Sequence, residues 1–98
     1  MPSITIEQFN ILSENRKKQM LVDAQKIAER RLGHMKFEFF KINDFFVEVT
    51  TDFSYKINRQ IKSYTFNDVP SFYAKEVVHY NINTTNVVPQ TFMVEYLH

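Results

Sequence analysis

The stretch Lys36–Val49, KFEFFKINDFFVEV, holds five phenylalanines in fourteen residues and decides the fold of this 98-residue chain. Apolar and polar side chains alternate through it in two runs, and a period of two is typical of β-strands. The runs flank Asn43-Asp44, two residue types that tolerate the positive φ of a two-residue hairpin turn. The sequence therefore predicts a β-hairpin with these opposed pairs: Ile42 and Phe45, Phe40 and Val47, Glu38 and Val49.

This register divides the hairpin into two apolar faces. The first face carries Phe40, Ile42, Phe45, Val47 and Val49, and we expect an N-terminal helix to pack on it. The second face is also too apolar for water, and contiguous exposed patches of this kind usually mark an interaction. It defines the predicted interaction surface: Met35, Phe37, Phe39, Phe46 and Tyr64. Either the segment Val69–Val78 or a second copy of the chain is expected to cover it.

N-terminal to the hairpin, Thr5 and Gln8 form the capping-box pattern that starts a helix. Ser13 offers a second cap, but Arg16, Lys17 and Lys18 would then oppose the dipole of a new helix in its first turn. The pattern thus allows one bent helix or two. Gln25–Leu32, QKIAERRL, is equally open: helix propensity favours a helix that ends at Gly33, whereas its alternation fits a strand.

After the hairpin, INRQIKSYTF predicts a further strand with Ile57 and Ile61 on one face and Tyr64 and Phe66 on the other. Asn67 or Asp68 is expected to cap a short helix that has Val69 and Pro70 in its first turn and runs through SFYAKEVV. The segment YNINTTNVVPQ is predicted as loop, and TFMVEYL as a last strand.

Composition excludes several classes of protein. The chain is 44% hydrophobic and has no cysteine, which excludes a disordered tail, a disulfide framework and a thiolate metal site. It shows neither a signal peptide nor an apolar run long enough to span a bilayer, so we expect a cytoplasmic protein without a membrane partner. Net charge is +1, divided as +3 over residues 1–41 and −2 over residues 42–98.

Several segments together resemble a group of short, uncharacterised bacterial proteins, and they span about two thirds of the chain. The segments that carry the resemblance are Leu12-Ser13-Glu14, Ala28-Glu29-Arg30, Asp44–Val49, Ile61–Tyr64, and Asp68-Val69 with Tyr73. The chain departs from that group before the first strand, where Asp23-Ala24-Gln25 replaces an acidic-glycine step. The resemblance implies an antiparallel sheet of about four strands with helices before and after it, favours a strand for Gln25–Leu32, and implies no activity.

Candidate chemistry is sparse. Three scattered histidines, no glycine-flanked serine and no metal-ligand spacing argue against an enzyme, a metal site or a cofactor. Glu38 and Glu48 fall on opposite faces of the hairpin, and Glu48 is expected to pair with Lys41 across the strands. Basic residues near exposed aromatic side chains can bind single-stranded nucleic acid. The candidate contacts are Arg16, Lys17, Lys18, Arg30 and Arg31, and nucleic acid is not the favoured partner.

The sequence therefore predicts one small α+β domain over residues 1–98, with an antiparallel sheet, one or two N-terminal helices and a short helix after the last long strand. The predicted function is a non-catalytic protein-interaction module that forms a homodimer through its aromatic sheet face. The alternative is a weak nucleic-acid-binding protein that uses the basic N-terminal half.

Overall fold

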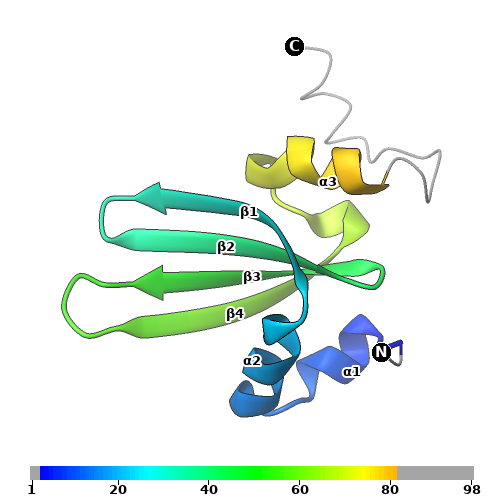
Figure 1. The fold of residues 1–98 in the computed structure, drawn as a ribbon, viewed down its shortest axis with the longest axis horizontal. Coiled ribbons are helices and arrows are strands. Elements are labelled where there is room, and N and C mark those ends of the chain that lie inside the picture. The colour runs from blue at the N-terminus through cyan, green and yellow to red at the C-terminus, as the bar shows by residue number, and fades with distance from the viewer. Residues whose placement is uncertain (1–2, 82–98) are drawn as a thin grey trace.

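The computed structural model describes residues 3–81, which form a four-stranded antiparallel sheet with helices on both faces. Helices α1 (Ile6–Asn10) and α2 (Glu14–Val22) precede the sheet, and α3 (Ala74–Asn81) follows it. Figure 1 shows α3 on one side of the sheet and α1 and α2 on the other. We call these sides the α3 face and the α1/α2 face. The predicted α+β class is confirmed; the predicted last strand TFMVEYL lies outside the described residues.

Two short helices begin the chain, which decides the alternative that the sequence leaves open. The side chain of Thr5 accepts a hydrogen bond from Gln8 N at 3.1 Å, and Gln8 Oε1 accepts one from Thr5 N at 2.9 Å. This is the predicted capping box. Ser13 then adopts extended backbone angles and accepts a hydrogen bond from Arg16 N, which starts α2. The Ser13 cap and Glu14 in the first turn offset the unfavourable position of Arg16 near the positive end of the helix dipole.

The sheet is a simple meander in the order β1-β2-β3-β4. Its strands are β1 (Gln25–Leu32), β2 (Met35–Ile42), β3 (Phe45–Asp52) and β4 (Asn58–Thr65). The β2–β3 hairpin has the predicted register throughout, with Ile42 opposite Phe45. Its turn residue Asn43 has a φ of 52°, the positive value that the Asn-Asp pair predicts.

Gln25–Leu32 is a strand, so the helical alternative for this segment is wrong. Gly33 does not end a helix; it occupies the β1–β2 turn with a φ of 57°. A β-bulge lies between Lys26 and Ala28. The extra residue turns Lys26 toward the α1/α2 face while Ala28 points to the α3 face, because a bulge shifts the alternation by one position.

The segment after β4 differs from its prediction. Phe66–Asp68 (η1) and Ser71–Tyr73 (η2) are short 3-10 helices, separated by extended Val69 and Pro70, and α3 begins only at Ala74. The predicted cap at Asn67 or Asp68 is therefore wrong. Proline disfavours the helical conformation in the residue before it, so Val69 is pushed into the extended region. The helix also continues to Asn81, beyond the predicted start of the loop at Tyr80.

Each face of the sheet has its own core. On the α1/α2 face, Phe9 and Leu21 pack on the predicted set Phe40, Ile42, Phe45, Val47 and Val49. On the α3 face, Tyr73, Ala74 and Val77 pack on Phe39, Phe46 and Ala28. Both cores gather near the β2–β3 turn. The other half of the sheet, which contains the β1–β2 turn and the β3–β4 loop, has no helix over it in Figure 1; we call this half the open end.

Candidate functional site

The predicted interaction surface is divided by burial into two parts. Phe39 and Phe46 are fully buried, because Tyr73 stacks on Phe39 with ring centroids 3.9 Å apart. The sequence leaves open whether Val69–Val78 or a second copy covers these rings. Tyr73, Ala74 and Val77 cover them, so Phe39 and Phe46 are core and not part of an exposed interaction surface. Tyr64 is half-buried against the same core. Met35 and Phe37 lie further along β2, at the open end, and stay partly accessible.

A polar cluster lies inside this aromatic core. The Tyr73 hydroxyl donates a hydrogen bond to Glu48 Oε2 at 2.6 Å. Burial raises the pKa of Tyr73 far above its ordinary value, and the carboxylate of Glu48 adds to the shift. Burial and the same carboxylate also raise the pKa of Tyr64. The Tyr73 hydroxyl thus stays protonated, and its hydrogen bond ties the segment after β4 to the sheet.

Sequence reasoning assigned Glu48 a different partner. Lys41, the predicted cross-strand partner, instead donates through Nζ to the carbonyl of Asn43, and Glu48 accepts its hydrogen bond from Tyr73. The signal was present in the pattern FFVEV, because a glutamate within an apolar strand needs a buried donor. The identity of that donor depends on how a segment 25 residues away folds back.

Arg30 and Arg31 point to opposite faces, so the predicted basic cluster is not one surface. Arg30 lies on the α3 face, where its guanidinium is 2.8 Å from Glu76 Oε1 and 5.4 Å from the centre of the Phe72 ring. This ion pair joins β1 to α3 and removes Arg30 from the set of free cations. Arg31 lies opposite Lys36 in the β1–β2 ladder, on the α1/α2 face, and its side chain is exposed.

The basic residues of α2 also diverge. Lys17 lies over the Phe9 ring at 5.8 Å, and Arg16 lines a hollow of about 530 Å³ between α1 and α2. Lys18 lines a different groove, of about 300 Å³, between α2 and the strands β2, β3 and β4. Four of the five predicted nucleic-acid contacts therefore lie on the α1/α2 side of the sheet, but the three on α2 do not form one surface. Arg30 lies on the α3 face.

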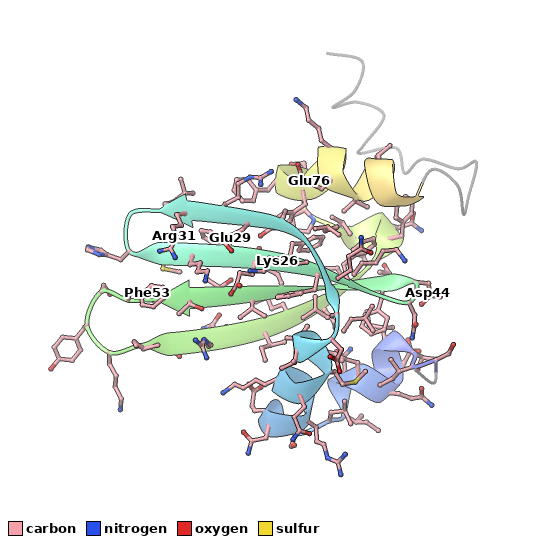
Figure 2. The ribbon with its side chains drawn as sticks, in the orientation of Figure 1. Lys26, Glu29, Arg31, Asp44, Phe53 and Glu76 are labelled. Carbon is pink, nitrogen blue, oxygen red and sulfur yellow. The ribbon has the colours of Figure 1, made fainter. Side chains whose placement is uncertain are left out.

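The open end carries most of the exposed large apolar side chains of residues 3–78. Four of them lie at or beside the two distal turns: Leu32, Phe53, Tyr55 and Ile57, exposed by 60%, 44%, 99% and 65%. Figure 2 shows Arg31 and Phe53 at this same end, away from Glu76 and Asp44. The sequence-based prediction missed this group of exposed apolar side chains, because it placed the interaction surface at the centre of the sheet.

The remaining features of the described part of the chain concern metal ligands and membrane-spanning helices. Within residues 3–81, histidine, aspartate and glutamate side chains form no group that could hold a metal ion. None of the helices in this range is both long and apolar enough to cross a membrane.

Comparisons with protein-family models, with curated proteins and with solved structures find no match for this chain. The resemblance to short bacterial proteins stays a prediction.

Proposed function

We propose that this protein is a non-catalytic protein-interaction module that self-associates through the open end of its sheet. The observation that carries the proposal is the exposure of two apolar side chains: Leu32, at 60%, at the end of β1, and Phe72, at 45%, in η2. Isolated apolar residues on a surface are ordinary, but a contiguous group of them indicates a contact surface.

These side chains form one patch. Leu32 lies directly opposite Met35 in the β1–β2 ladder, and Met35 lies two residues from Phe37 on the same face of β2. The Phe37 and Phe72 rings meet edge to face with centroids 6.0 Å apart. We call the four residues Leu32, Met35, Phe37 and Phe72 the apolar patch. It retains two residues of the predicted interaction surface and replaces the buried ones.

Charged side chains border the patch. Asp52 lies opposite Met35, and Arg30 lies opposite Phe37 next to Glu76. Because Glu76 already neutralises Arg30, the apolar side chains and not these charges supply the contact. A two-fold dimer interface is self-complementary, so the apolar patch of one copy meets the same patch of the other.

The area of the apolar patch determines how tightly two copies are expected to associate. The patch spans two strands, β1 and β2, and the ring of Phe72. Two strands with about four residues along each cover about 130 Å² at ordinary sheet spacings. A standard stable interface buries about 800 Å² per partner, so self-association through this surface is expected to be weak and reversible.

Light scattering on the purified chain, over about a hundredfold range of concentration, tests the proposal by mass action. We expect the average mass to rise with concentration, and Leu32→Glu or Phe72→Glu to abolish the rise because each buries a charge in the contact. Ile11→Glu is the matched control, since Ile11 is 85% exposed at the C-cap of α1, outside the patch. A monomeric wild type at every concentration contradicts the proposal, as does equal loss in the control.

A further inference from the structure

A row of basic residues crosses the open end on the α1/α2 face, opposite the apolar patch. The strand registers pair Arg31 with Lys36, Lys36 with Thr51, and Thr51 with Arg59. Residues paired in this way share one face of a sheet, so the three cations project to the same side over a width of about 14 Å. We call Arg31, Lys36 and Arg59 the basic row.

Much of this charge is free within the described part of the chain. Glu29 and Glu38 occupy the next row of the same face, and Lys26 Nζ lies 2.9 Å and 2.7 Å from their carboxylates. Lys36 is 3.7 Å from Glu38, a loose contact. Between residues 3 and 78, Arg31 and Arg59 make no ion pair, and both are exposed. Lys26 thus pairs with the nearest acids and Lys36 shares Glu38 with it, while the charges of Arg31 and Arg59 stay unpaired.

An aromatic ring extends the row. Phe53 N donates a hydrogen bond to His34 O at 2.9 Å, which continues the β2–β3 register by one pair beyond Met35 and Asp52. Alternation then places Phe53 on the same face as Thr51, beside the row. The ring is 44% exposed. Figure 2 shows Phe53 and Arg31 at the same end of the sheet.

A groove continues the surface toward α2. Its lining includes two cations, one acid and several apolar side chains: Lys18, Arg59, Glu38, Val49 and Ile61. The groove measures about 300 Å³. Cations along an open sheet face, a ring beside them and an apolar hollow next to them match the parts from which single-strand binding surfaces are built.

We propose that this face binds single-stranded nucleic acid, with Arg31, Lys36 and Arg59 on phosphates and Phe53 stacked on a base. The proposal is independent of self-association, which uses the opposite face. An acidic peptide would match the cations equally well, but it would leave the exposed ring without a planar partner. The aromatic residue therefore favours nucleic acid over an acidic protein segment.

Fluorescence polarisation with labelled oligothymidylate and oligouridylate of about 15 nucleotides tests the proposal. Binding should weaken between about 50 and 200 mM salt, with a slope of log K against log salt near −2, as three phosphate contacts on a single strand predict. Arg31→Glu and Arg59→Glu should each weaken binding about tenfold or more and flatten that slope. Phe53→Ala should weaken binding about tenfold and leave the slope unchanged, because stacking releases no counterions.

Lys75→Glu is the matched control, because it makes the same charge change on exposed α3, outside the row. Circular dichroism verifies that each variant stays folded. The absence of salt-sensitive binding by the folded wild type overturns the proposal, and so does an equal loss of affinity in Lys75→Glu. Polyglutamate that competes as well as the oligonucleotide also overturns it, and assigns the row to acidic protein partners instead.

Discussion

Tyr73 shows at the scale of one residue how the aromatic face of the sheet is closed. Its ring lies almost parallel to that of Phe39, at an interplanar angle of 8°, and its hydroxyl donates to Glu48. The side chain is fully buried. It therefore supplies apolar area to the core and also the donor that a carboxylate in such a place requires.

Replacing Tyr73 with phenylalanine keeps the ring and removes only the donor. We expect Tyr73→Phe to lower the free energy of unfolding at neutral pH by about 1–3 kcal/mol, because Glu48 is left without that hydrogen bond. Urea titration followed by circular dichroism measures the difference. Tyr55→Phe is the control, because Tyr55 is 99% exposed and its hydroxyl should contribute nothing.

Because the pKa of Tyr73 is raised in the folded protein, the difference in free energy of unfolding between wild type and Tyr73→Phe depends on pH. Above about pH 10 an unfolded tyrosine loses its proton, while the folded protein still holds the Tyr73 proton. The contribution of Tyr73 is thus complete below about pH 10 and declines as pH rises beyond it. The stability gap between wild type and Tyr73→Phe should narrow over that range; a constant gap would contradict the assignment.

At the scale of the element, the two hairpin turns depend on one residue each with positive φ. Gly33 and Asn43 have φ values of 57° and 52°. A Cβ added at Gly33 meets no atom within 4 Å, so substitution there changes only the backbone energy. Asn43 does more than turn the chain, since its Nδ2 donates to Ile4 O at 3.1 Å and so holds the N-terminus against the sheet.

Gly33→Ala is expected to destabilise the protein by about 1–2 kcal/mol, the cost of a left-handed conformation for an L side chain. Gly33→Asn should cost less, because asparagine tolerates this region. Thermal unfolding of both variants tests whether Gly33→Asn loses less stability than Gly33→Ala. Equal losses would mean that the turn relaxes to another conformation when glycine is absent.

At the scale of the whole molecule, one sheet serves two cores. Adjacent residues of β2 belong to different cores. Phe39 packs against Tyr73 in the α3 core, whereas Phe40 packs against the N-terminal helices in the α1/α2 core. A domain of this size has a total stability of only about 5–15 kcal/mol, so each core alone is too small to hold the sheet. The two layers should therefore unfold together.

Val47→Ala, in the α1/α2 core, and Val77→Ala, in the α3 core, test this coupling. Both side chains are fully buried. Each change should lower the free energy of unfolding by about 1–3 kcal/mol through lost contacts and the cavity left behind. Far-UV circular dichroism and tyrosine fluorescence should give the same midpoint in each variant, as a two-state transition requires. Separate midpoints would show that the layers unfold independently.

The sequence by itself determined the features that depend on neighbouring residues. The period of two in Lys36–Val49 set the hairpin register and its two apolar faces, because slipping by one residue would turn every phenylalanine to the wrong side. The Thr5–Gln8 capping box predicted where α1 begins, because both of its hydrogen bonds lie within one helical turn.

The features that depend on distant residues were decided only by the tertiary structure. Gln25–Leu32 is a strand because β2 offers it a ladder, although its own propensity favours a helix. Phe39 and Phe46 became core because Tyr73 and Val77 return over them. Arg31 and Arg59, 28 positions apart in the chain, share a row because three strand registers align them. Local periodicity carries no information on such pairings, since they arise from contacts between segments far apart in the sequence.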